Sequence, residues 1–357
     1  MQPVSETTEL VLPGLDEADL GMSMAAPQPG HWIERGPQKR LMVFSGRSHP
    51  ELAERIAEQL GVELGAMTPT SFANGETHVR YEESIRGSDV FLVQTGCSPI
   101  DQNLMELFQM IQAAKLGSAK RITAVIPLFP YARQDRKAKP REPITARLVA
   151  DFLQTAGADR ILTMDLHAGQ IQGFFTIPVD HMTALPLFAR HFRDLGLVGG
   201  GVVSVSPDTG RAKQAERFAE MIEAEFAIMH KSRPADDVAL VTEIAGRVRG
   251  KRAIIGDDVI MTGGTMMANV AALQENGATE VWIFATHGVF CNGALEMFAK
   301  TDAIKGIVVT DTVPINPRSR PDKLTVLPVS GLLAETIMNV FADDSVSAIF
   351  GGENQLF

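Results

Sequence analysis

An acidic pair and a glycine-rich turn adjoin in the stretch GDDVIMTGGT, residues 256–265. The neighbouring carboxylates of Asp257 and Asp258 suit the vicinal hydroxyls of a sugar or a hydrated metal ion. Small residues that open a helix suit an anion, because backbone N–H groups there can donate hydrogen bonds to it. A plain strand-to-helix turn needs only one capping residue, whereas this turn carries several. The stretch therefore predicts a sugar-phosphate site, whose anion-binding part consists of Thr262, Gly263, Gly264 and Thr265.

Positive charges are concentrated in a second segment, FPYARQDRKAKPREPITARLVADFL at residues 129–153. Taken alone, Lys137 and Lys139 would fit a solvated surface loop. A triphosphate requires several positive partners, and a loop that follows a strand can present them together. The segment therefore predicts a polyphosphate site, and its polar residues are Tyr131, Arg133, Gln134, Asp135, Arg136, Lys137, Lys139 and Arg141.

Two single polar residues also follow apolar runs, His167 in TMDLHAGQIQGFF and Asp208 in SPDTGRAK. A histidine in an apolar context is more often a satisfied core residue than a ligand, and an aspartate after a strand often forms an Asx turn. Placed at one crevice, the two side chains would suit Mg²⁺. Their role therefore depends on the elements that carry them.

Those elements alternate between strand-like and helix-like runs from residue 40 onward, which predicts an α/β fold with mostly parallel sheets. A glycine followed by an apolar strand recurs at residues 117–127, 157–167 and 277–288. Each glycine fits a helix C′ position with positive φ. In open α/β sheets, ligands bind at the carboxyl ends of the strands. The polar groups described above all fall at such ends.

The length of 357 residues favours two domains rather than one. Residues 1–38 are rich in proline without a sustained period and are expected to form a flexible extension. The predicted domains are 39–184, with 341–357 packing on it, and 185–340, which carries the acidic pair. The polar stretch HKSRPADD at 230–237 is expected to be an exposed loop.

Composition limits the possible partners. The net charge of −10 argues against a broad nucleic-acid-binding face. Two cysteines, Cys97 and Cys291, provide no disulfide framework and indicate a reduced compartment. No apolar run reaches the roughly 18 residues of a membrane span, and no basic residue precedes Arg35, unlike in a secretory signal. We expect a cytoplasmic protein without nucleic-acid or membrane partners.

Six motifs in order over residues 40–357 resemble the ribose-phosphate pyrophosphokinase family, also called phosphoribosyl pyrophosphate synthetases. They are FANGET, FPYARQD, MDLHAGQIQGFF, SPDTGRAK, FAIMHKSR and the acidic-pair loop, and this loop also resembles that of type I phosphoribosyltransferases. The resemblance implies two phosphoribosyltransferase-like domains, each a mostly parallel sheet flanked by helices, in a homo-oligomer that is usually a hexamer built from dimers. It also implies transfer of the β,γ-diphosphoryl group of Mg-ATP to O1 of ribose 5-phosphate, giving 5-phosphoribosyl 1-diphosphate and AMP.

The resemblance assigns roles to matching residues. It implies transition-state stabilisation by Lys231 and Arg233 on a closing loop, with Mg²⁺ near His167 and Asp208. It implies that Asp257 and Asp258 address the ribose hydroxyls and that Thr262, Gly263, Gly264 and Thr265 hold the 5-phosphate. The implied ATP-binding residues are Phe72, Asn74, Glu76, Arg133, Gln134, Asp135 and His167.

Departures from the family pattern leave alternatives open. Met261 replaces an acid, which predicts weaker ribose 5-phosphate binding with activity retained. The resemblance implies a site for ADP or phosphate effectors at Lys137 to Arg141, Gly169 to Gln172 and residues 345–350. Gly169 replaces a serine found in many members and so removes a hydroxyl that could bind an anion, which leaves phosphate activation open. One alternative is a noncatalytic regulatory paralogue of the synthetase, and the retention of His167, Asp208, Lys231 and Arg233 argues against it. A phosphoribosyltransferase would share the acidic-pair loop but leave FANGET and FPYARQD unexplained.

Overall fold

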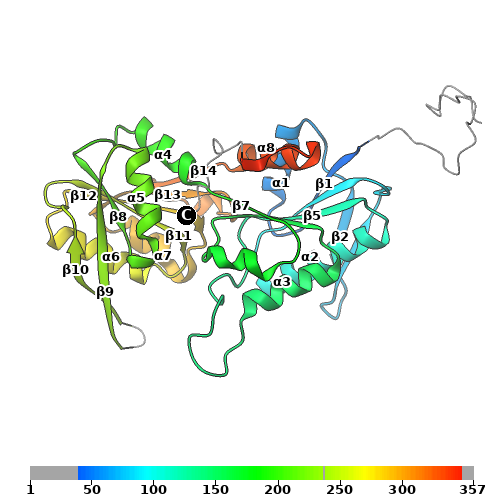
Figure 1. Ribbon diagram of the computed structural model, residues 1–357, viewed down its shortest axis with the longest axis horizontal. Helices are drawn as coiled ribbons and strands as arrows, with labels where there is room; N and C mark the ends of the chain where they lie inside the picture. Colours follow the sequence, from blue (N-terminus) through cyan, green and yellow to red (C-terminus); the bar gives the residue numbers. More distant parts are fainter. Residues whose placement is uncertain (1–38, 236–237, 348–357) are drawn as a thin grey trace, which may run out of the picture. The chain divides into compact units, whose positions relative to one another are not determined.

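The computed structural model describes residues 39–235 and 238–347, and from 231 to 242 it describes strand backbone but not side chains. The first sheet has five parallel strands in the order β1-β4-β5-β6-β7 (Figure 1). Its strands are β1 (Leu41–Ser45), β4 (Asp89–Val93), β5 (Arg121–Ile126), β6 (Arg160–Met164) and β7 (Val179–Met182). A separate antiparallel hairpin consists of β2 (Met67–Ser71) and β3 (Thr77–Tyr81).

The second sheet has seven strands in the order β10-β9-β8-β11-β12-β13-β14, and only β10 pairs in the antiparallel sense. Its strands are β8 (Val202–Ser206), β9 (Glu225–Ala235), β10 (Val238–Ala245), β11 (Arg252–Ile260), β12 (Glu280–Gly288), β13 (Ile304–Thr310) and β14 (Leu324–Leu327). Apolar and β-branched residues dominate the central strands because both of their faces are covered.

Helices connect the parallel strands in both sheets. The α-helices are α1 (Pro50–Leu60), α2 (Ile100–Leu116), α3 (Thr145–Ala156), α4 (Leu185–Asp194), α5 (Ala212–Met221), α6 (Gly264–Glu275), α7 (Ala294–Ala299) and α8 (Ser330–Ala342). Short 3₁₀ turns are η1 (Gly169–Phe174), η2 (Thr209–Arg211), η3 (Cys291–Gly293) and η4 (Pro317–Ser319). The expected α/β class with two mostly parallel, helix-flanked sheets is confirmed.

Alternating strand residues divide the core, because successive side chains point to opposite faces of a sheet. In the first sheet, Phe44 and Leu92 pack with α2 and α3, whereas Val43 and Phe91 face a cluster that includes α1, α4 and α8. This second cluster continues into the other sheet through residues such as Phe284. The two sheets therefore share one apolar core. The far face of the second sheet packs against α6 and α7.

Hydrogen bonds join the carboxyl ends of the two sheets. Thr95 Oγ1 donates to the Thr312 carbonyl at 2.7 Å, and Thr286 Oγ1 donates to Asp165 Oδ2 at 2.6 Å. His287 Nε2 lies 3.1 Å from the Met164 carbonyl. These polar groups are buried, so their bonds fix the two edges against each other.

The glycine prediction is confirmed at two of its three positions. Gly157 and Gly277 follow α3 and α6 with φ of 116° and 85°. It is wrong at Gly117, whose φ is −74°, because the left-handed residue after α2 is Ser118, with φ of 62°.

The predicted loop at 230–237 is wrong over its described part. Residues up to Ala235 continue β9, which pairs with β10 through Val238 and Ala235 and through Leu240 and Ser232. Backbone pairing in this hairpin satisfies the N–H and C=O groups whatever the polarity of the side chains. A polar stretch could therefore form a strand that side-chain pattern does not reveal.

The predicted boundary at 184/185 stays a prediction. The first sheet ends with β7 at Met182 and the second begins with β8 at Val202. Helix α8, which follows the second sheet, packs against α1 (Figure 1). The extension at 1–38 and the chain end at 348–357 lie outside the described residues. Within the described ranges no helix is both long and apolar enough to cross a bilayer.

Candidate active site

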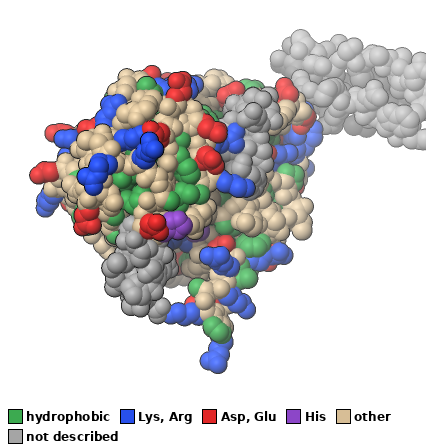
Figure 2. Space-filling model, turned by 60° about the vertical axis from the view of Figure 1, so that its left-hand side comes forward, with side chains coloured by type: hydrophobic (Ala, Val, Ile, Leu, Met, Phe, Trp, Pro, Cys, Tyr) green, Lys and Arg blue, Asp and Glu red, His purple; other side chains and the backbone are tan. Residues whose placement is uncertain are grey.

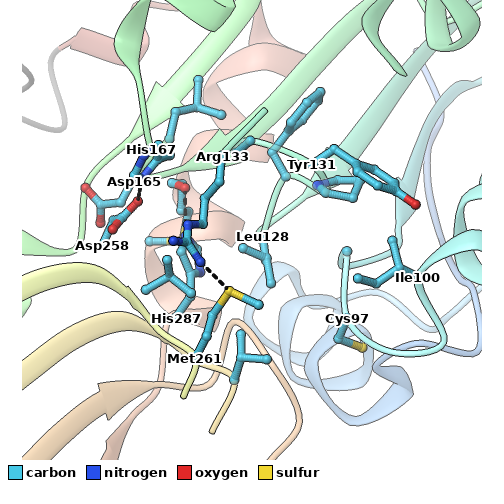
Figure 3. Close-up of a pocket in the computed structure, with 18 of the residues that line it drawn as sticks. Cys97, Ile100, Leu128, Tyr131, Arg133, Asp165, His167, Asp258, Met261 and His287 are labelled. Carbon is cyan, nitrogen blue, oxygen red and sulfur yellow. Dashed lines mark hydrogen bonds and ion pairs between the residues drawn. The ribbon is translucent and has the colours of Figure 1, made fainter. Parts of the chain in front are cut away.

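A cavity of about 330 Å³ lies where the carboxyl ends of the two sheets meet. Segments that follow β4, β5 and β6 line it from the first sheet, and the ends of β11 and β12 line it from the second. Figure 3 shows that His167 and Asp258 point toward each other across this junction, while Arg133 reaches toward Met261. The cavity therefore lies at the carboxyl ends of the strands, where the sequence predicts ligand binding.

The acidic pair lies within the last residues of β11 rather than in a turn after it. Asp257 is paired with Ala285 of β12, but β8 accompanies β11 only as far as Ile255. The β8 side of the end of β11 is thus unpaired after Ile255, so side chains from other segments can reach the acidic pair there. The side chain of Asp258 is 3% exposed and that of Asp257 is 24% exposed, so Asp257 is the more accessible carboxylate.

Two groups hold Asp258. His167 Nδ1 lies 2.7 Å from Asp258 Oδ2, and Arg211 Nη2 lies 2.6 Å from Asp258 Oδ1. Arg211 Nε also lies 2.9 Å from Asp257 Oδ1. Because a carboxylate only accepts, the imidazole carries its proton on Nδ1. The structure therefore unites three predicted residues with Arg211, which the sequence interpretation did not single out although it lies in the quoted SPDTGRAK motif.

The two carboxyls differ in acidity. Burial and the negative charge of Asp258 raise the pKa of Asp257 to about 7. Burial alone would also raise the pKa of Asp258, but the hydrogen bond from His167 and the charge of Arg211 outweigh it and lower that pKa below its usual range. Asp258 is therefore the permanently ionised member of the pair.

The glycine turn leaves the amino end of α6 open. Gly263 precedes the helix with φ of 76°, and a Cβ there would lie 2.6 Å from the Phe298 ring. At Gly264 no atom lies within 4 Å of the position that a Cβ would take. No side chain caps the first turn. Backbone N–H groups at this helix end can therefore be approached closely by an anion.

The cationic segment borders the same cavity at one end only. Tyr131, Arg133 and Gln134 line it, and Arg133 Nη1 lies 3.0 Å from the Met261 sulfur, a weak acceptor. Tyr131 has a positive φ of 58°, which is uncommon outside glycine. Residues 136–141 are exposed, and the segment extends away from the sheet in Figure 1. Figure 2 shows Lys and Arg side chains on such a projecting arm.

Several predicted residues lie elsewhere. Phe72, Asn74 and Glu76 occupy the turn of the β2–β3 hairpin outside the cavity lining, with Phe72 54% exposed. Asp208 Oδ1 accepts a hydrogen bond from the Gly210 N–H at 2.9 Å. This bond forms the Asx turn that the sequence allowed as the alternative to a metal-binding role. Asp135 is half-buried and absent from the lining. Their roles stay predictions.

The catalytic prediction falls on side chains that the structure does not describe. Lys231 and Arg233 lie in β9, where only the backbone is described. Among the residues that are described, no three His, Cys, Asp or Glu side chains group together as a metal site. Asp165 and His287, both buried beneath the cavity, were not predicted as site residues. Their strand-end positions were the available signal.

Family models match both halves of the chain. Residues 41–157 match the N-terminal domain of ribose phosphate pyrophosphokinase, and residues 238–351 match the phosphoribosyl synthetase-associated domain.

Relatives and a solved structure agree with these matches. The ribose-phosphate pyrophosphokinase of Corynebacterium efficiens is 48% identical over 90% of this chain and 99% of its own length. That of Mycobacterium tuberculosis is 47% identical over 88% of this chain and 97% of its own length. The crystal structure of phosphoribosylpyrophosphate synthetase from Mycobacterium smegmatis has a TM-score of 0.79 and 48% identity, covering 85% of this chain and 99% of that chain.

Proposed function

The chain belongs to the ribose-phosphate pyrophosphokinase family, and from this premise we propose that it transfers the β,γ-diphosphoryl group of Mg-ATP to O1 of ribose 5-phosphate. The products are 5-phosphoribosyl 1-diphosphate and AMP. One observation carries the proposal: Asp258 of the buried acidic pair lines the same cavity as Arg133. The open amino end of α6 at Gly264 follows three residues after Met261, which also lines that cavity. Groups that could accept from hydroxyls, hold an anion and bind a phosphate thus lie in one cavity or directly next to it.

The ribose phosphate is held by the second sheet. Asp257, the more accessible carboxylate, accepts from the ribose hydroxyls, while Asp258 is held in place by His167 and Arg211. The 5-phosphate lies against the backbone of Thr262, Gly263, Gly264 and Thr265. The space at Gly264 supports this assignment, because a side chain there would stand between the phosphate and the helix end.

The nucleotide is held by the first sheet and its loops. Arg133, with Gln134 beside it, faces the phosphates from the cavity wall. Phe72, Asn74 and Glu76 contact the adenine, with Asp135 and His167 completing the site. An exposed aromatic ring on a hairpin turn is suited to stacking on a base, which supports this part of the proposal.

Mg²⁺ bound together with ATP would supply charge neutralisation at the phosphate oxygens. An ion held mainly by substrate phosphates needs only one or two protein contacts. His167 and Asp208 are the proposed contacts, since Asp208 commits only one carboxylate oxygen to its turn. Lys231 and Arg233 stabilise the charge on the transferring group.

Alignment and charge stabilisation dominate the mechanism. In a loose phosphoryl-transfer transition state the nucleophile gains little from a general base. The acidic pair orients the sugar so that O1 faces the β-phosphorus, and Arg133 restrains the polyphosphate. The hydrogen bonds that join the two sheet edges keep these groups from drifting apart.

The test incubates purified protein with Mg-ATP and ribose 5-phosphate and quantifies AMP and 5-phosphoribosyl 1-diphosphate. Equal formation of both products is expected. AMP without the sugar product would contradict diphosphoryl transfer. No product from folded, ATP-binding protein would instead identify a regulatory paralogue.

Assembly and regulation complete the proposal. The proposed assembly is a homo-oligomer of the hexamer type in the cytoplasm, as in the family. The proposed effectors are ADP or phosphate, which would bind near residues 137–141 and 169–172. Sedimentation with and without phosphate tests both, and a monomer that ignores phosphate would contradict them.

A further inference from the structure

The side chain of Arg211 is largely buried, which is unusual for an arginine. It ends η2 immediately before α5, and its side chain is only 16% exposed. Nε reaches Asp257 Oδ1 at 2.9 Å, and Nη2 reaches Asp258 Oδ1 at 2.6 Å. Nη1 donates to Gln214 Oε1 at 3.1 Å, which orients the guanidinium from the side away from the acids. The group is therefore held between two neighbouring carboxylates.

This arrangement occupies the place where a divalent cation would bridge the pair. A guanidinium delivers two hydrogen bonds in a fixed plane and remains charged at all accessible pH values. Both oxygens of Asp258 already accept, one from Arg211 and one from His167. Among the described residues no three His, Cys, Asp or Glu side chains form a metal site, and His167, the histidine beside the pair, turns Nδ1 toward Asp258 rather than toward a shared ion. The ligand set of the acidic pair therefore does not fit a metal ion of its own.

We propose that Arg211 is the resident cation of the acidic pair, so that Asp257 and Asp258 bind the hydroxyls of the sugar phosphate without a dedicated divalent cation. The identity of the sugar phosphate rests on the proposed function, whereas the exclusion of a metal from the pair does not. A built-in cation lets a doubly charged sugar phosphate approach two carboxylates at any Mg²⁺ concentration.

Manganese binding tests the exclusion without any substrate. Electron paramagnetic resonance counts Mn²⁺ bound to the wild type, to Asp257→Asn and to Arg211→Gln. Asp257→Asn is expected to leave the wild-type count unchanged. Arg211→Gln is expected to gain one ion, which the double variant with Asp257→Asn loses again. Lys213→Gln, which removes the same charge from an exposed position of α5, is the matched control and gains none.

The wild-type comparison needs no variant of Arg211, so it decides the matter even if Arg211→Gln does not fold. A wild-type Mn²⁺ ion that disappears in folded Asp257→Asn would overturn the proposal. A folded Arg211→Gln that gains no ion would overturn it too. Circular dichroism reports folding for every variant.

Calorimetry of ribose 5-phosphate tests the consequence for the sugar. Wild-type affinity is expected to agree within about twofold between EDTA and millimolar Mg²⁺. Arg211→Gln is expected to bind at least about tenfold more weakly in EDTA and to recover with Mg²⁺, since the pair then recruits the metal. Wild-type binding that requires Mg²⁺ would overturn the proposal. Wild-type protein that binds no ribose 5-phosphate in either buffer would count against the proposed function, while the manganese result still decides the role of Arg211.

Discussion

The two ends of the cavity are built differently. At the proposed ribose end, Asp258 is almost fully buried, and both of its carboxylate oxygens are held, one by His167 and one by Arg211. At the proposed nucleotide end, Arg133 is exposed, and its hydrogen-bond partner among the described residues is a weakly accepting thioether, while Phe72 stands on an exposed hairpin. The ribose end is organised before substrate arrives, whereas the nucleotide end is completed by it. Substitutions at the ribose end should therefore lower both stability and turnover. Substitutions at the nucleotide end should mainly lower the affinity for ATP.

Asp258→Asn should have the largest effect. It leaves the guanidinium of Arg211 without half of its counter-charge in a buried site, at a cost of about 3–5 kcal/mol in unfolding free energy. AMP formation should fall by at least about a hundredfold, because the sugar loses its orientation. Chemical denaturation and a product assay measure the two effects. Asp302→Asn, at an exposed acid, is the control, and a folded Asp258→Asn with normal turnover would show that the ribose end is not preorganised by this pair.

Acid should weaken the support beneath the cavity. Burial is the main cause that lowers the pKa of His181 to about 4, and the charged groups that face its ring are Asp165 and His287. In the unfolded chain the same histidine has a pKa near 6.5. The unfolded state binds the proton first as pH falls, so stability is lost between about pH 6.5 and 4. Between pH 7 and 5 this histidine should account for about 2 kcal/mol.

Urea unfolding of the wild type and of His181→Gln at both pH values isolates that contribution. The variant should show a smaller loss on acidification by about that amount. Identical losses in both proteins would mean that another group carries the pH dependence.

Gly263→Ala and Gly264→Ala should separate folding from binding at one turn. Gly264→Ala places a methyl group in open space, so stability should change by less than about 1 kcal/mol. The KM for ribose 5-phosphate should rise about tenfold, because the methyl group stands where the phosphate approaches. Gly263→Ala should instead lower stability by about 1–3 kcal/mol, since its φ is positive and Phe298 is too close. Thermal unfolding and initial rates distinguish the pair, and an unchanged KM in Gly264→Ala would move the phosphate elsewhere.

Met261→Asp should have the smallest effect and links the two ends. The new carboxylate should lower the KM for ribose 5-phosphate about threefold, as the family pattern implies. It should raise the KM for ATP to a similar extent, because Arg133, now 3.0 Å from the sulfur, would pair with the acid. Met261→Leu keeps the bulk without charge and should change neither constant. If the KM for ribose 5-phosphate stayed the same or rose in Met261→Asp, the weak-binding interpretation of Met261 would be wrong.

The sequence predicts the strand-end position of the acidic pair because the signal is local. Asp257, Asp258 and the glycines follow one another along the chain, and the strand pattern places them at a carboxyl edge. Arg211 escaped prediction because its partners are more than forty residues away and its motif gives no sign of which way the side chain turns. The β9–β10 hairpin escaped because backbone pairing, which has no side-chain signature, formed a strand from polar residues. The helix end at Gly117 was also mispredicted, because the residue with left-handed φ is Ser118, one position later than the glycine.

The packing of α8 against α1 has a consequence for how the protein is made. Leu333 and Ile337 fill the same cluster as Leu52 and Ile56, so the first sheet lacks part of its core until the last helix has been synthesised. At roughly 5–20 residues per second, a ribosome needs on the order of ten to thirty seconds to travel from residue 184 to 342. The amino-terminal half is made first but completes its fold last, and during that interval apolar faces of β1 and α1 are exposed to the chaperones of the cell.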